Sequence, residues 1–191
     1  MVQAKEGKVK LFFVDASHFV MGGFSGAIWT KVRRYVRTAS GRQRYNVLGA
    51  LDFVTKKVET IANSSYISAT EVIALIDKLT SSYIGFNIKL VMDNARYQHC
   101  KAVIEHAAMV GVELIFLPTY SPNLNLIERL WKFVKAEVLN ASYHASFDDF
   151  KEIIDGCIQN THTLHKKRLD TLISEKVQFF DTVSSQTLMA A

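Results

Sequence analysis

Three acidic residues of this 191-residue chain stand where a carboxylate could take part in chemistry. Asp15 follows the apolar run "LFFV", Asp93 follows "KLVM", and Glu128 stands within "SPNLNLIERLWKFVK". Three carboxylates at one place would repel, because two unit charges about 4 Å apart interact by about 4 kcal/mol at an effective dielectric of about 20. Such a cluster needs protons or cations to neutralise it, and an all-oxygen ligand set favours Mg²⁺, or Mn²⁺ in its place.

Two such ions clamp an in-line displacement at phosphorus, since one activates the attacking oxygen and the other stabilises the leaving oxygen. Structural roles compete with this hypothesis. Either aspartate could be a turn or N-cap residue. Glu128 could complete a helix-capping box that begins at Asn125, and it could pair with Lys132 one turn further on. For single residues these alternatives stay open.

The elements that must position these residues follow from the apolar patterns. Short runs rich in aliphatic and aromatic residues predict strands, whereas apolar residues three and four apart predict helices. Ser68 with Glu71, and Ser146 with Asp149, are typical of helix starts. We therefore predict strands at 9–15, 44–55, 57–68, 87–93 and 112–118, and helices at 68–83, 99–111 and about 125–140, from 146, and around 169–177.

This order of elements indicates an α/β fold with a five-stranded mixed sheet flanked by helices. The first strands are close in sequence and can pair antiparallel, whereas the later strand–helix–strand unit needs a crossover and should be parallel. If the strands that carry Asp15 and Asp93 are parallel neighbours, both carboxylates emerge at one edge, where open α/β sheets build sites. The presence of both aspartates at equivalent strand ends favours a shared site.

The helix expected from about residue 125 should hold Glu128 beside that edge. Its apolar seam leaves Glu128 on the flank of the helix that also carries Lys132 and Lys135. A helix packed on the sheet could therefore hold Glu128 over the two aspartates. The seam consists of Leu124, Ile127, Trp131, Val134 and Val138.

Composition indicates a globular protein of the cytoplasm, since hydrophobic residues make up 49% and charged residues 21%. No apolar run approaches the roughly 18 residues that cross a bilayer, and the first ten residues lack the apolar centre of a signal peptide. The two cysteines, Cys100 and Cys157, form neither a metal-ligand pair nor a disulfide framework. We expect no membrane partner and no secretion.

A basic segment suggests a polyanionic partner. No acidic residue stands between Asp15 and Asp52, and Trp29, Tyr35 and Tyr45 are interleaved with the basic residues there. Basic and aromatic residues together favour nucleic acid, although a solvated basic hairpin is the alternative. The candidate DNA-binding residues are Lys31, Arg33, Arg34, Arg37, Arg42 and Arg44, together with Lys132 and Lys135.

Three blocks of the sequence resemble a known family. "FFVDASHF", "LVMDNARYQH" and "LPTYSPNLNLIERLWKFVK" are similar to the three signature blocks of DDE transposases, in the insertion-sequence branch of the mariner superfamily. The acidic triad of that family falls on Asp15, Asp93 and Glu128, and the 34 residues between the last two are characteristic of the superfamily. The resemblance runs from about Lys8 to about Gln178.

The resemblance implies a ribonuclease-H-like fold and Mg²⁺-dependent DNA cleavage and strand transfer. The triad would be catalytic and would hold two metal ions. The implied partners are the terminal inverted repeats of the element and the target DNA, with a homodimer on DNA. Hydrolysis at the element ends would precede attack of the freed 3′-hydroxyl on the target.

Two departures from the family matter. Ala16 stands where many relatives carry an acid, which we expect to affect metal binding little because that position lies outside the triad. The strand of Asp15 begins within ten residues of Met1, so we expect residues 1–191 to be one catalytic domain with a helical extension from about residue 162. The helix-turn-helix reader of the family would then come from an upstream reading frame. The alternative function is a catalytically silent remnant that binds DNA or serves in assembly.

Overall fold

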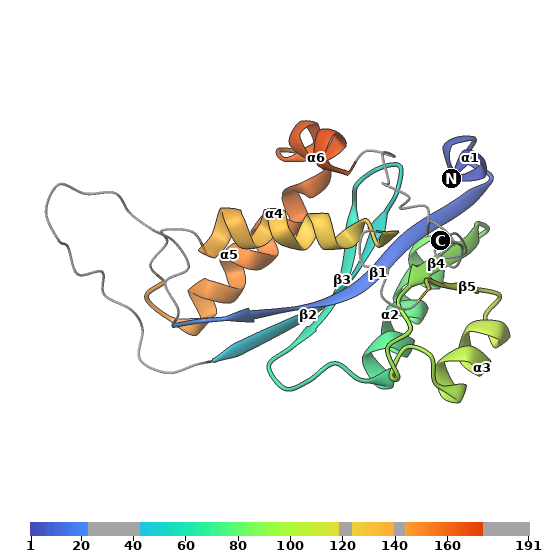
Figure 1. Ribbon diagram of the computed structural model, residues 1–191, viewed down its shortest axis with the longest axis horizontal. Helices are drawn as coiled ribbons and strands as arrows, with labels where there is room; N and C mark the ends of the chain where they lie inside the picture. Colours follow the sequence, from blue (N-terminus) through green and yellow to red (C-terminus); the bar gives the residue numbers. More distant parts are fainter. Residues whose placement is uncertain (23–42, 119–123, 140–143, 174–191) are drawn as a thin grey trace, which may run out of the picture.

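The computed structural model describes residues 1–22, 43–118, 124–139 and 144–173. Its centre is a five-stranded sheet in the order β3-β2-β1-β4-β5, in which β1 pairs antiparallel with β2 and parallel with β4 (Figure 1). The predicted mixed sheet is therefore confirmed. The strands are β1 (Val9–Val20), β2 (Arg44–Asp52), β3 (Val58–Asn63), β4 (Asn87–Met92) and β5 (Glu113–Phe116).

The helices begin where the sequence supplies caps. Ser68 and Glu71 form the capping box of α2, with the Ser68 N–H donating to Glu71 Oε2 at 2.7 Å, and Ser146 and Asp149 cap α5 in the same way. Both predicted boxes are confirmed. The helices are α1 (Val2–Lys5), α2 (Ala69–Ser82), α3 (Lys101–Met109), α4 (Ile127–Leu139), α5 (Phe147–Gln159) and α6 (Lys166–Leu172), with a 3₁₀ turn at Asn160–His162. No helix in the described ranges is long and apolar enough to cross a membrane.

Two apolar cores lie on the two faces of the sheet. Alternate residues of β1 point to opposite faces, so Phe13 and Phe19 pack on the side of α4, α5 and α6. Phe12 and Val14 pack with α2 and α3 on the other side. In Figure 1, α4 crosses one face of the sheet with α5 beside it, while α2 and α3 lie against the opposite face. Helices on both faces complete the predicted α/β layers.

The structure corrects the apolar faces that the sequence predicts for two outer helices. The apolar spacing groups Ile104 of α3 with Val103 and Ala107, and directs Ile153 of α5 inward, but Ile104 is 40% exposed and Ile153 is 46% exposed. Each follows or precedes a buried residue, and one step along a helix turns the side chain by about 100°. Leu172 of α6 is 46% exposed for the same reason, whereas Leu169 is buried. Val177 lies outside the described residues.

Strand β1 is longer than predicted. It continues past Asp15 to Val20 and pairs with β2 along its whole outer half, where Val20 lies opposite Arg44. The two strands form a hairpin that runs on beyond the rest of the sheet (Figure 1). Asp15 therefore lies inside a strand rather than at its end, which corrects the predicted boundary.

Candidate active site

The parallel ladder between β1 and β4 places Asp15 and Asp93 side by side. Its last pair is Phe13 with Val91, and two residues beyond each of them stands an aspartate. Because β4 ends at Met92 while β1 continues, Asp15 lies on the edge of β1 that β4 no longer covers. Both carboxylates therefore emerge at one edge, as expected. The difference is that Asp93 follows a strand end, whereas Asp15 lies within a strand.

Glu128 reaches this edge from the first turn of α4. Ile127, Trp131, Val134 and Val138 of the predicted seam are buried, so Glu128 stays on the flank of the helix. The capping box from Asn125, the alternative role considered for Glu128, does not form. The Asn125 side chain instead donates from Nδ2 to the Val14 carbonyl at 3.0 Å, and its Oδ1 accepts no hydrogen bond within the described part of the chain.

Asp15 and Glu128 line one pocket of about 250 Å³ between β1 and α4. Lys132 and Lys135 lie on the same wall, as the spacing along α4 predicts. Anionic and cationic groups therefore share one hollow at the sheet edge. The remaining lining residues are Ala16, Ser17, His18 and Trp131.

The pKa values show electrostatic interaction among the three carboxylates. Burial, together with the charges of Asp93 and Glu128, raises the pKa of Asp15 to about 7, against a hydrogen bond from the Ala16 backbone and the charge of Lys135, which lower it. Burial and the Asp93 charge also raise the pKa of Glu128, although Lys132 opposes them. Tyr97 lies near the same charges, since burial, Asp15 and Asp93 raise its pKa to about 12. The site thus holds more negative charge than its surroundings neutralise.

The donor set fits a hard divalent cation. All three groups offer carboxylate oxygen, and a cation would relieve the repulsion that raises the pKa of Asp15. In the part of the chain described by the structure, no three His, Cys, Asp or Glu side chains converge closely enough to hold a single ion. Like charges separate when no cation lies between them, which gives a physical reason for this spacing.

The loop after β4 supports Asp93. Asp93 Oδ1 accepts a hydrogen bond from the Ala95 N–H at 3.2 Å, and the buried Gln98 packs behind it. Asn94 is exposed, and its amide reaches the Leu117 carbonyl at 3.5 Å. Sequence reasoning missed Gln98, because a glutamine within a polar turn carries no periodic or spacing signal.

The candidate DNA-binding residues divide into described and undescribed groups. Lys132 is exposed on α4, and Lys135 Nζ lies 5.7 Å from the centre of the Phe19 ring. Arg44 is exposed at the start of β2. Lys31, Arg33, Arg34, Arg37 and Arg42 lie outside the described residues.

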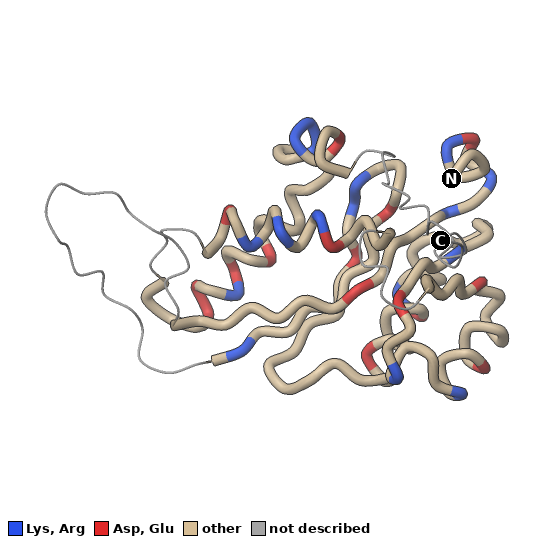
Figure 2. Tube along the Cα trace, viewed as in Figure 1, with Lys and Arg blue, Asp and Glu red and all other residues tan. Residues whose placement is uncertain are grey.

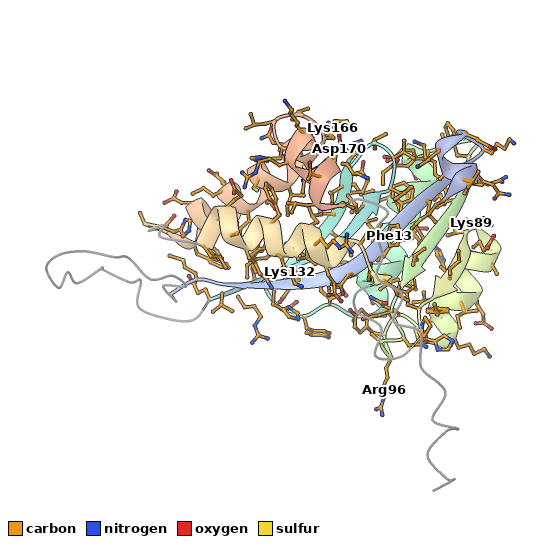
Figure 3. The ribbon with its side chains drawn as sticks, turned by 45° about the horizontal axis from the view of Figure 1, so that its top comes forward. Phe13, Lys89, Arg96, Lys132, Lys166 and Asp170 are labelled. Carbon is orange, nitrogen blue, oxygen red and sulfur yellow. The ribbon has the colours of Figure 1, made fainter. Side chains whose placement is uncertain are left out.

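A further exposed cation was not predicted. Arg96 stands on the loop three residues after Asp93 and extends away from the body of the protein (Figure 3). Basic positions also recur along α4, interspersed with acidic ones (Figure 2). Arg96 differs from other surface cations because it stands in the loop that follows Asp93.

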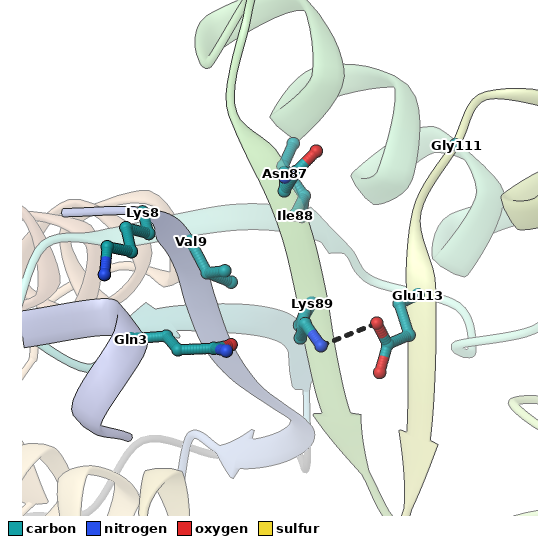
Figure 4. Close-up of a pocket in the computed structure, with 8 residues that line it drawn as sticks. All are labelled: Gln3, Lys8, Val9, Asn87, Ile88, Lys89, Gly111 and Glu113. Carbon is teal, nitrogen blue, oxygen red and sulfur yellow. Dashed lines mark ion pairs between the residues drawn. The ribbon is translucent and has the colours of Figure 1, made fainter. Parts of the chain in front are cut away.

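A second pocket lies at the opposite end of the parallel strands. It measures about 350 Å³ and is lined by residues that include Lys8, Asn87 and Lys89 (Figure 4). Lys89 pairs with Glu113 at 2.7 Å, so the carboxylate of that lining is already neutralised. This hollow is larger than the one at Asp15, but its described lining offers one paired carboxylate rather than a cluster.

Comparison with known proteins agrees with this geometry. The sequence model of a family described as DDE superfamily endonuclease matches residues 10–153, about three quarters of the chain. No curated protein sequence matches it.

Solved structures share the fold. The Mos1 transposase in its paired-end complex with the left transposon end superposes with a TM-score of 0.63 at 14% identity, covering 94% of this chain and 59% of that one. The isolated catalytic domain of Mos1 mariner transposase gives a TM-score of 0.54 at 12% identity, over 94% and 91%. The catalytic core domain of BIV integrase gives 0.52 at 14% identity, over 81% and 84%.

These likenesses define the fold as ribonuclease-H-like, of the kind found in transposase and integrase catalytic domains. The chain belongs to the DDE superfamily endonuclease family. The chain spans about half to three fifths of the length of the first solved structures that it matches, which are an intasome and Mos1 complexes.

Proposed function

We propose that this chain is the catalytic domain of a transposase that cuts DNA at the ends of a mobile element and joins those ends to target DNA. The observation that carries the proposal is that Asp15, Asp93 and Glu128 lie near enough to one another at one edge of the sheet for the charges of Asp93 and Glu128 to raise the pKa of Asp15. Family membership supports the same activity. The complexes of Mos1 with transposon ends and after strand transfer support DNA as the partner.

Asp15, Asp93 and Glu128 would hold two Mg²⁺ ions, or Mn²⁺ ions. When bound, the ions supply positive charge to the reacting phosphoryl group and to its entering and leaving oxygens. Structures of Mos1 paired-end complexes solved with Mn and with Mg support this choice of metal. The protein contributes the fixed frame, since a strand, a strand end and a helix each carry one carboxylate.

Both chemical steps exchange one P–O bond for another. Water attacks the phosphodiester at the element end and leaves a free 3′-hydroxyl, which then attacks a phosphodiester of the target. No covalent protein–DNA bond forms, so the site needs no nucleophilic side chain. Lys132 and Lys135 line the pocket and would hold the phosphates on either side of the reacting one.

The DNA track would continue along the β1–β2 hairpin. Arg44 lies at the outer end of the described hairpin, opposite Val20, and Lys31, Arg33, Arg34, Arg37 and Arg42 would add positive charge for DNA. Such contacts bind the backbone without reading sequence. Recognition of the inverted repeats would therefore rest on a helix-turn-helix partner from an upstream frame. Two catalytic chains would pair on DNA, in the cytoplasm at the nucleoid.

Divalent-cation-dependent nicking of supercoiled plasmid by the purified chain tests the proposal. We expect nicking with Mg²⁺ or Mn²⁺, none with EDTA, and none from Asp93→Asn or Glu128→Gln. Asp170→Asn, which removes an exposed carboxylate of α6, is the matched control and should nick normally. Unchanged nicking by Asp93→Asn would refute the assignment, and metal-independent DNA binding without nicking would favour the silent remnant.

A further inference from the structure

We propose that Gln98 is a positioning residue that fixes which carboxylate oxygen of Asp93 is free to bind a cation. The inference rests on the proposed function, because it assigns a role within the same site. Gln98 is fully buried, with 0% of its surface exposed, whereas glutamine is ordinarily a surface residue. A buried carboxamide is expected to have a hydrogen-bonding task.

The backbone brings Gln98 back to Asp93. The loop after β4 turns tightly, and the Gln98 N–H donates to the Ala95 carbonyl at 2.9 Å. This turn places the Gln98 carboxamide against both Oδ1 and the main-chain oxygen of Asp93. Two oxygens of a single residue therefore face one amide group.

The chemistry of these partners sets the orientation of the amide. Both atoms that Asp93 presents are acceptors, so the carboxamide nitrogen must face them, and it then donates to Oδ1 and, at 3.0 Å, to the carbonyl oxygen. The opposite orientation would bury an oxygen against two acceptors. The other amide atom lies 3.3 Å from the Tyr97 hydroxyl and is then the oxygen, which accepts from that hydroxyl.

Oδ1 of Asp93 consequently receives two donors. The Ala95 N–H donates to it at 3.2 Å, and the Gln98 amide donates from the other side. These bonds fix the orientation of the carboxylate and leave Oδ2 without a hydrogen bond from the described residues. Hydrogen bonds that orient ligating carboxylates typically change metal affinity by about 10- to 100-fold when they are removed.

The test measures Mn²⁺ binding to the purified chain by electron paramagnetic resonance, with thermal unfolding in EDTA as the check on folding. Gln98→Met keeps the length of the side chain but removes both donors, and Gln98→Asn keeps an amide that is too short to reach Oδ1. We expect each to weaken Mn²⁺ binding about tenfold or more. Gln159→Met, an exposed glutamine at the end of α5, is the control and should bind as the wild type does.

A double-mutant cycle separates positioning from general damage. If Gln98 acts through Asp93, Gln98→Met should add no further loss of Mn²⁺ affinity in the Asp93→Asn background. An equal additional loss there, or unchanged Mn²⁺ affinity in either folded single variant, overturns the inference. Wild-type protein that binds no Mn²⁺ through Asp93 overturns the proposed function as well.

A crystal structure with Mn²⁺ tests the inference without any variant. We expect the metal on Asp93 Oδ2 and the Gln98 nitrogen within about 3 Å of Oδ1. Metal on Oδ1 would overturn the inference while leaving the proposed function intact.

Discussion

Gly49 lies directly opposite Asp15 on the neighbouring strand β2, and its missing side chain leaves the space that Trp131 fills. A Cβ atom at position 49 would lie 2.7 Å from Trp131 Cζ2 and 3.2 Å from Ile127 Cδ1. Glu128 follows Ile127 in the first turn of α4. The approach of α4 to the sheet, and with it the distance from Glu128 to Asp15, therefore depends on a glycine at position 49.

Gly49→Ala should push α4 away from the sheet. Overpacking of this kind lowers the free energy of unfolding by about 1–3 kcal/mol, and the displacement of Glu128 should reduce Mn²⁺ affinity and nicking together. Urea unfolding and Mn²⁺ titration measure the two effects. Adding Trp131→Phe should restore part of both, because phenylalanine lacks the ring atoms nearest the new Cβ.

Gly156→Ala is the matched control for that substitution. Gly156 lies within α5 and has open space where a Cβ would stand, so alanine should stabilise the protein by up to about 1 kcal/mol. Metal binding should not change. If Gly49→Ala proved as stable and as active as the wild type, Gly49 would not set the position of α4.

Asn125→Ala should loosen the start of α4. The Asn125 Nδ2 atom donates to the carbonyl of Val14, the residue before Asp15, and the Glu128 N–H donates to the Asn125 carbonyl at 3.1 Å. Loss of the side-chain donor leaves a buried carbonyl unpaired, which costs about 1–3 kcal/mol. We expect lower stability in urea and weaker Mn²⁺ binding from the same variant.

Asn160→Ala controls for the loss of an asparagine. Asn160 is exposed and bonds within its own turn, to the Gly156 carbonyl at 2.8 Å. The free energy of unfolding should change by less than about 0.5 kcal/mol and Mn²⁺ affinity should stay the same. Normal Mn²⁺ binding by Asn125→Ala would show that the tether to Val14 does not position Glu128.

The sheet and the helix starts could be predicted from the sequence because local signals carry them. Apolar runs located all five strands, and the Ser68 and Ser146 capping boxes located two helix starts. The spacing along α4 also placed Glu128 beside Lys132 and Lys135. Each of these patterns depends on residues within one turn or one strand of each other.

The contacts that connect distant segments could not be predicted in this way. The bond from Asn125 to Val14 joins residues 111 positions apart, and the local pattern around Asn125 instead suggested a cap. Gly49 acts through Trp131, which lies on another element. The length of β1 was missed because its outer half is stabilised by pairing with β2, and the sequence beyond Asp15 is not a continuous apolar run.

Asp15→Asn should stabilise the metal-free protein at high pH. Burial raises the folded-state pKa of Asp15 from 3.8 to about 7. The contribution of this carboxyl to the free energy of unfolding is therefore fully present below about pH 4, where it is protonated, and is lost as the pH rises to 7. The variant escapes that loss, which should amount to a few kcal/mol at pH 8, at about 1.4 kcal/mol per pKa unit. Urea unfolding in EDTA at pH 5 and pH 8 measures the difference.

Mg²⁺ should make the wild type more stable than Asp15→Asn, the reverse of the order in EDTA at high pH. Mg²⁺ at pH 8 should stabilise the wild type in proportion to the logarithm of its concentration and leave Asp15→Asn almost unchanged. Asp170→Asn should respond to pH and to Mg²⁺ as the wild type does, since that carboxylate is exposed on α6. A difference between Asp15→Asn and the wild type that does not depend on pH would contradict the buried-charge explanation.

Lys132→Ala and Arg96→Ala should weaken DNA binding without weakening Mn²⁺ binding. Lys132 lines the pocket that holds Asp15, and Arg96 projects from the loop after Asp93 (Figure 3), so the two cations lie on elements that meet at the site. Removal of one cation that neutralises a phosphate should lower the slope of log affinity against log salt by about 0.9. Fluorescence anisotropy with labelled duplex at several salt concentrations gives that slope.

Lys8→Ala distinguishes DNA binding along the site edge from general attraction of DNA by the net positive charge of the chain. Lys8 is 70% exposed and lies at the other end of β1, beside the pocket that contains the Lys89–Glu113 pair (Figure 4). If DNA runs along the edge that holds Asp15 and Asp93, Lys8→Ala should leave the salt slope unchanged, because the loss of one distant charge is largely screened beyond about 10 Å. Equal losses from Lys8→Ala and Lys132→Ala would instead mean that DNA is attracted by the basic chain as a whole, and the path of DNA past the carboxylates would have to be abandoned.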